Sequence, residues 1–352
     1  QESIYTIETD KGRALGDLAH IVGASDSAAS PRGQADPDIE DRESADNLVL
    51  ACPRHHRQID TDLGQGLFDI DTLRSLKAKH EGAIKAATDA ATQERTTPIR
   101  LLGDIEGGAV GATVNQCAQA IMATEGRLPG WSSGSYDPDG AEVDLRQLPQ
   151  ARGETYYAAA CARIDEAVED IKRKHAGGRL SRASVFAAAK IPLLVYFGHR
   201  YDDTIPTTVY QRHKVEQAWA WPETETHLEF DSVLPELPGT TEIVLSVGVT
   251  AVPDLARLPT EISDLPRWSL TAKPTGDSVI SSPAALDDFE HALRAVYTRI
   301  DESPITRVHL IAAVPVAAAV TLGRAWDRSH HIPVVVYERN RDGYSAALEV
   351  TA

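Results

Sequence analysis

Residues 307–337 read RVHLIAAVPVAAAVTLGRAWDRSHHIPVVVY, and this stretch indicates the fold class. Val308–Ala313 and Pro333–Tyr337 are apolar runs of strand length, and Val316–Trp326 between them has the length and composition of a helix. Two apolar strands joined by a helix are expected to pair in parallel within one sheet. Pro315, just before the helix, suits the first helical turn. The stretch therefore predicts an α/β fold.

The same alternation of strands and helices extends upstream to about residue 99. Strands are predicted at Ile99–Leu102, Ile191–Phe197 and Glu242–Val247, and helices at Val114–Thr124, Tyr156–Lys174 and Pro283–Ile300. A strand, a turn of small residues and a helix follow one another near 99–124 and again near 307–327. This echo predicts two Rossmann-like halves, at about 96–225 and 226–352.

The N-terminal part has a different pattern, and 352 residues exceed what one hydrophobic core usually supports. Ile4–Thr9 predicts a short strand, Asn47–Cys52 fits a strand or the start of a helix, and residues 71–92 predict a helix. Thr96–Pro98 breaks the pattern, so we place a linker there, between domains 1–95 and 96–352. Because the sequence starts mid-pattern at Gln1 without a signal segment, we expect the first domain to be truncated.

Composition narrows the class of protein. The sequence has 42% apolar and 25% charged residues, as globular proteins do, and no apolar run long enough to predict a membrane span. Its three cysteines are too widely spaced for a disulfide framework, which indicates a reducing cytoplasm. A net charge of −17 argues against a passive nucleic-acid binder. Any contact with DNA would have to be local and would rely on a metal ion and on subunit assembly.

The N-terminal part concentrates residues suited to phosphodiester hydrolysis, which needs a base to activate water and a cation to stabilise negative charge. The candidates are His20, Asn47 and the run Cys52-Pro53-Arg54-His55-His56. With Ala19-His20-Ile21, Asn47-Leu48-Val49-Leu50, Ile59-Asp60 and Leu76-Lys77-x-x-His80-Glu81 in order, this region resembles the HNH endonuclease family. The resemblance implies a ββα-metal domain that cuts double-stranded DNA with Mg²⁺ or Mn²⁺.

The resemblance also implies roles for individual residues. His20 is the expected general base, His56 the expected metal ligand, and Asn47 the residue that orients the His20 region by hydrogen bonding. Many family members carry an Asp ligand where this chain has Ala19, and Asp17 is the alternative carboxylate. Cys52 and His55 have the spacing of half a structural Zn²⁺ site, which needs two more ligands.

The C-terminal part resembles SAVED domains, the cyclic-oligonucleotide sensors of CBASS antiphage systems. The resemblance rests on residues 192–200 (PLLVYFGHR), 202–204 (DDT), 209–213 (VYQRH), 219–221 (WAW) and 309–319, with Gly323-Arg324 and Tyr344. Nucleotide phosphates favour helix N-termini, and bases favour aromatic or guanidinium planes. The predicted ligand contacts are therefore Arg200, Tyr201, Arg212, Trp219, Trp221, Pro315 and Tyr344.

Together the two resemblances imply an HNH–SAVED effector of the CBASS type. A cyclic di- or trinucleotide, such as a cGAMP isomer, would bind the sensor, promote a dimer or tetramer, and activate largely nonspecific DNA cleavage. Two alternatives stay open. One is a restriction-type HNH endonuclease whose C-terminal domain reads DNA, and the other is a nucleotide sensor with an inactive nuclease domain.

Overall fold

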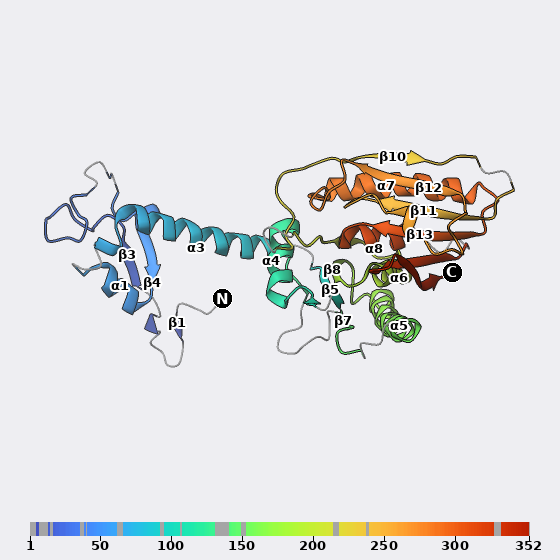
Figure 1. The fold of residues 1–352 in the computed structure, drawn as a ribbon. Helices are drawn as coiled ribbons and strands as arrows, with labels where there is room; N and C mark the ends of the chain where they lie inside the picture. Colours follow the sequence, from blue (N-terminus) through green and yellow to red (C-terminus); the bar gives the residue numbers. More distant parts are fainter. Residues whose placement is uncertain are drawn as a thin grey trace. The chain divides into compact units, whose positions relative to one another are not determined.

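The computed structural model describes residues 5–6, 13–14, 17–35, 39, 41–61, 66–91, 95–105, 108–130, 141–148, 153–213, 218–236, 239–326 and 332–351 (Figure 1). The chain divides into two compact units, Gln1–Thr88 and Asp89–Ala352. Each unit is described below by itself. Among the described residues, no helix combines the length and apolarity needed to cross a membrane.

The first unit contains an antiparallel hairpin followed by helices. Strand β3 (Asp17–His20) pairs with β4 (Leu48–Ala51), so that His20 lies opposite Leu48. Helix α1 (Pro53–Ile59) packs on the hairpin, and α3 (Ile70–Ala91) comes later in the chain. A small core holds the two strands to the helices; its buried members are Ala19, Ile21, Ile59 and Leu73.

The remaining described elements of this unit are short. A 3-10 turn, η1 (Ala45–Asn47), precedes β4, so Asn47–Cys52 is strand for most of its length. The predicted helix at 71–92 is α3. Of the strand predicted at Ile4–Thr9, only β1 (Tyr5–Thr6), which pairs with β2 (Arg13–Ala14), falls within the described residues.

The second unit contains two sheets, and the N-terminal one is built around a long strand, β5 (Thr97–Ile105). Parallel strands flank it: β7 (Ala141–Asp144) on one side, then β8 (Ala183–Ala188) and β9 (Thr207–Val209) on the other. The short β6 (Gly108–Val110) adds an antiparallel edge. Helices α4 (Val114–Glu125) and α5 (Glu154–Ala176) are those that the sequence predicted.

Within the described residues, the C-terminal sheet has six strands in the order β10-β12-β11-β13-β14-β15. Its four central strands are parallel, and antiparallel strands close both edges. The strands are β10 (Glu229–Val233), β11 (Glu242–Gly248), β12 (Arg267–Lys273), β13 (Arg307–Ala313), β14 (Val334–Arg339) and β15 (Tyr344–Val350). Helices α7 (Pro283–Asp301) and α8 (Val316–Ala325) complete this half, with η2 (Leu255–Arg257). The parallel pairing predicted across residues 307–337 is confirmed, since Val308 lies opposite Val334.

Two sequence predictions in this unit are wrong. Ile191–Phe197, predicted as a strand, is part of helix α6 (Ile191–Tyr201), whose first turn contains Pro192. The run is apolar on nearly every side because α6 is almost entirely buried, and such a run has no periodicity that separates helix from strand. Thr96–Pro98, predicted as a linker, leads directly into β5, where Pro is tolerated near a strand's start.

Helices α6 and α8 form the contact between the two halves (Figure 1). Helix α6 also touches β14 and β15 of the other half, and α8 touches β8 and β9. Gly198 of α6 faces the backbone of Val320, and Gly323 of α8 faces the backbone of Val195, so a side chain at either glycine would collide with the opposite helix. The two glycines allow the helices to pack backbone to backbone, and one continuous core spans both sheets.

Candidate functional site

The carboxyl ends of strands from both sheets come together where α6 and α8 begin. Strand β8 leads through Lys190 into α6, and β13 leads through Pro315 into α8. Polar contacts join the halves here. Lys190 Nζ lies 2.7 Å from Glu338 Oε1 on β14, and Gln211, just after β9, accepts a hydrogen bond from Ala317 N at 3.1 Å. We call this region the joint carboxyl edge; in open α/β sheets, ligands bind at such edges.

One polar cluster at the joint carboxyl edge is formed by Lys190, Tyr157 and Glu338, here called the Lys190 cluster. The Tyr157 hydroxyl donates to Glu338 Oε2 at 2.6 Å, so both carboxylate oxygens are engaged. Burial and the hydrogen bond to Glu338 raise the pKa of Tyr157, which therefore stays a donor. The Lys190 ammonium also lies 5.2 Å from the centre of the Tyr156 ring. The cluster thus combines a cation with a phenol donor, while the Tyr156 and Tyr157 rings themselves are buried in the hydrophobic core.

Three of the predicted ligand residues lie at this edge. Pro315 is the N-cap residue of α8. Arg212 follows β9 and is partly buried beside Gln211. Tyr344 opens β15 opposite Arg339, where β14 ends.

The other four predicted ligand residues are placed differently, and the structure corrects the roles assigned to them. Tyr201, Trp219 and Trp221 are buried in the hydrophobic core, with at most 6% of their surface exposed, so a base cannot stack on them. Arg200 lies in the last turn of α6, about 14 Å along the helix from Ile191. There its guanidinium pairs with Asp165 at 2.7 Å.

Sequence reasoning missed Lys190, Tyr157 and Glu338. The sequence predicts a strand after Lys190, and a lysine before a strand has no special position. Pro192 was the signal that a helix begins there, which places Lys190 between a buried strand and a helix N-terminus.

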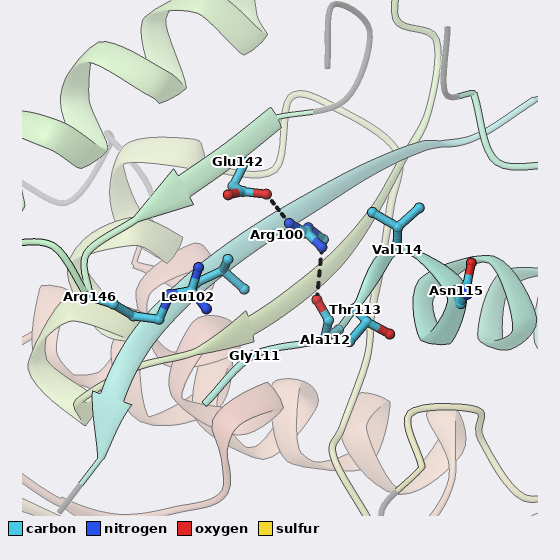
Figure 2. A pocket seen from close by; sticks show the side chains of 9 residues that line it. All are labelled: Arg100, Leu102, Gly111, Ala112, Thr113, Val114, Asn115, Glu142 and Arg146. Carbon is cyan, nitrogen blue, oxygen red and sulfur yellow. Dashed lines mark hydrogen bonds and ion pairs between the residues drawn. The ribbon is translucent and has the colours of Figure 1, made fainter. Parts of the chain in front are cut away.

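A polar hollow of about 390 Å³ lies in the N-terminal half, at the start of α4 (Figure 2). Its charged side chains already have partners in the protein. Arg100 forms an ion pair with Glu142 and donates to the Ala112 carbonyl at 3.1 Å, and Arg146 pairs with Asp144 at 2.8 Å. The α4 terminus is closed by a capping box in which Gln116 N donates to Thr113. The hollow contains none of the predicted ligand residues.

In the first unit, Asn47 holds the chain just beyond His20. Its buried amide accepts from Val22 N and donates to Val22 O, both at 2.8 Å, and donates to Arg42 O. His20 ends β3, and its Nε2 lies 3.1 Å from Glu43 Oε1.

A buried arginine links the two histidine regions. Arg32, with 5% of its side chain exposed, donates to the carbonyls of His20, Ile21 and Ile59 at 2.8–3.0 Å. It also lies 3.5 Å from Asp60, whose other oxygen is 3.8 Å from His56 Nε2. The contacts fix the end of β3 against the end of α1.

The described residues do not fit a ready-made metal site. No three His, Cys, Asp or Glu side chains among them gather closely enough to hold an ion. Asp17 and His20 are three residues apart on one strand, so they lie at opposite ends and on opposite faces of β3. Cys52 Sγ lies 3.2 Å from His55 Nδ1, but the described residues supply no further ligand for zinc.

The second unit is a double Rossmann-like α/β domain. Its two sheets have parallel central strands, pack together through helices α6 and α8, and meet at the joint carboxyl edge. A family model supports a closer assignment. The SAVED model, described as "SMODS-associated and fused to various effectors sensor domain", matches residues 164–350, more than half of the chain. The chain therefore belongs to the SAVED family.

A solved structure has a similar fold. The Acinetobacter baumannii Cap4 SAVED/CARF-domain containing receptor with the cyclic trinucleotide 2′3′3′-cAAA matches with a TM-score of 0.50 and 13% identity, over 85% of this chain and 62% of that chain. The Moraxella osloensis Cap4 receptor matches with a TM-score of 0.43 and 16% identity, over 62% of this chain and 48% of that one. The chain thus spans less than two thirds of these receptors' length. No curated protein matches.

Proposed function

We propose that this chain is a ligand-gated effector of the CBASS type. A cyclic oligonucleotide binds the SAVED domain, and binding activates cleavage of double-stranded DNA by an HNH-type first unit. Ligand-driven assembly into a dimer or tetramer completes the proposal, because it makes cleavage depend on the ligand.

The proposal that the SAVED domain binds a cyclic oligonucleotide rests on one observation, the joint carboxyl edge in a chain of the SAVED family. A cyclic oligonucleotide offers several phosphates and bases on one compact ring, so it suits an edge formed by strands of two sheets. The Lys190 cluster places a cation and a phenol donor there, which are groups that phosphates favour. The Acinetobacter receptor, whose fold is similar, is described with cyclic trinucleotides.

Two features support the nuclease half of the proposal. The hairpin of β3 and β4 is followed by helix α1, and the sequence of this region resembles the HNH endonuclease family. His20 is proposed to take the proton from the attacking water, and Asn47 fixes the backbone beyond it. His56, beside Asp60, is the second histidine that the proposal requires for cleavage. Arg32 keeps both histidine regions in place through backbone carbonyls.

The experiment is plasmid cleavage in Mg²⁺ or Mn²⁺, with EDTA as a blank, in the presence of 2′3′3′-cAAA, 3′3′3′-cAAA, cGAMP isomers or cyclic di-AMP. We expect one nucleotide to switch cleavage on, and His20→Ala and His56→Ala each to abolish it without loss of nucleotide binding. His227→Ala, which changes an exposed histidine of the second unit, is the control and should cut normally. Cleavage that ignores every nucleotide would refute gating and favour a restriction-type enzyme.

A second candidate function is a nucleotide sensor whose first unit does not cut. It is favoured by one observation, that the described residues assemble no three-ligand metal site. In that case the same assay gives nucleotide binding without cleavage under any metal. The two His→Ala variants would then match the wild-type protein in every readout.

A further inference from the structure

Glu338 holds an unusual position in the Lys190 cluster. Its carboxylate reaches from β14 of the C-terminal half to two donors of the N-terminal half, Lys190 and Tyr157. Each oxygen has its own partner, at 2.7 and 2.6 Å, and 28% of the glutamate side chain remains exposed. The carboxylate therefore makes charge-assisted contacts at the edge where a ligand is expected.

The donors that hold Glu338 are also those that a phosphate would use. A phosphate, like a carboxylate, presents anionic oxygens, and it accepts from an ammonium and a phenol at the same distances. The buried ring of Tyr156 lies against the Lys190 ammonium and helps to hold it at this edge. In a chain of net charge −17, a cation at this edge is the feature that favours an anionic ligand, and Glu338 neutralises it.

An ordinary structural ion pair is the alternative explanation, and the chain contains a matched example. Glu349 on β15 pairs with Arg307 at 3.0 Å, at the amino end of β13, with 40% and 35% of the side chains exposed. Exposed pairs of this kind contribute little by themselves. If Glu338 were only such a pair, its removal would affect ligand binding no more than removal of Glu349.

We propose that Glu338 is an internal anion that occupies the position of one ligand phosphate, and that Lys190 and Tyr157 bind that phosphate once Glu338 is displaced. The inference rests on the proposed function of the SAVED domain and names residues that recognise its ligand. Glu338 competes with the ligand for the same two donors, so it sets the concentration at which the sensor responds. The exposed fraction of the side chain gives the displaced carboxylate a path to solvent.

The test is a calorimetric titration of the full chain with 2′3′3′-cAAA, 3′3′3′-cAAA, cGAMP isomers and cyclic di-AMP, comparing wild type, Glu338→Gln, Lys190→Gln and Glu349→Gln. Glutamine keeps the shape of Glu338 and an acceptor for Tyr157 but removes the charge. We expect Glu338→Gln to lower Kd about tenfold, Lys190→Gln to raise it about tenfold or more, and Glu349→Gln to leave it unchanged. Melting temperatures confirm that each variant is folded.

The outcomes separate the inference from the proposed function. If wild type binds a nucleotide and Glu338→Gln binds it no tighter, Glu338 is not a competitor and the inference is wrong. If Glu338→Gln weakens binding as Lys190→Gln does, Glu338 instead positions the lysine, which also overturns the proposal. If wild type binds no nucleotide of the panel, the proposed function fails, and the inference fails with it.

Discussion

Substitution of Gly323 by alanine probes the contact on which the two-sheet domain depends. A methyl group at this position would collide with the Val195 carbonyl oxygen and would lie 2.7 Å from His199 N, both in the backbone of α6. Backbone atoms have no rotamer that moves them away, so the helices must separate. Restoring an ordinary contact of 3.4 Å requires a shift of about 0.7 Å at His199 N and a larger one at the Val195 oxygen.

The cost follows from the contacts that such a shift weakens. A gap of 0.5–1 Å removes about a quarter to a half of each atom pair's attraction of about 0.1–0.2 kcal/mol, so weakening on the order of 60 pairs, about as many as one buried leucine makes, costs about 3 kcal/mol. Strain adds about 1–3 kcal/mol, and the better helix propensity of alanine offsets about 1 kcal/mol. We expect Gly323→Ala to lower the free energy of unfolding by about 3–5 kcal/mol, a large fraction of a domain's stability.

Urea unfolding followed by tryptophan fluorescence measures this, because Trp219 and Trp326 are buried in the same core. Gly82→Ala is the control. Gly82 also lies within a helix, α3, but nothing approaches the position of its missing Cβ, so alanine there should be neutral or slightly stabilising. A Gly323→Ala protein within 0.5 kcal/mol of wild type would show that α6 and α8 do not pack backbone to backbone.

Three further predictions follow from single contacts. Arg32→Gln leaves buried carbonyls without their donor, so it should destabilise the first unit by about 2–4 kcal/mol and speed its hydrogen exchange; unchanged exchange would contradict this. Burial raises the pKa of the Cys117 thiol to about 12, so iodoacetamide at pH 8 should modify exposed Cys52 and leave Cys117 unmodified in a peptide map. Burial raises the pKa of Asp202, but hydrogen bonds, chiefly from Lys172, lower it further than burial raises it. The ionised Asp202 carboxylate thus stabilises the fold fully above its unfolded-state pKa, and this stabilisation is lost as pH falls through the lowered folded-state pKa. The Tm difference between wild type and Asp202→Asn should therefore be largest near pH 7 and vanish in acid. A Tm difference that stays constant with pH would refute this prediction.

The fold was predictable where length and flanking residues distinguish helix from strand. Val308–Ala313 is too short for a long helix and lies before a Pro-initiated segment, so β13 and α8 were both assigned correctly. Helix α6 was not, because burial by β14, β15 and α8 removes the polar face that marks a surface helix. Strand β8, Ala183–Ala188, is likewise buried throughout and shows no alternation.

The site was predictable only in part, for a related reason. Pro315 is identified by its local context, since a proline after an apolar strand indicates where a helix begins. The tryptophans were chosen for their chemistry alone, and a large aromatic ring is as suited to a core as to a nucleotide base. Lys190 and Glu338 belong together only through the meeting of two sheets, a contact between distant segments that no local pattern encodes.

The two halves are equivalent where their helices cross and different at the joint carboxyl edge. Val195 and Gly198 of α6 correspond to Val320 and Gly323 of α8, each glycine facing the valine carbonyl of the other helix. This reciprocity is required, because either methyl group would push both helices apart. The N-terminal ends of the two helices are not in contact in this way and can differ. Helix α6 begins after Lys190, whereas Ala317 N in the first turn of α8 donates to the Gln211 side chain of the other half. Fusion of the halves in one chain lets the edge become asymmetric while the packing remains symmetric, so a bound ring would meet different donors from each half.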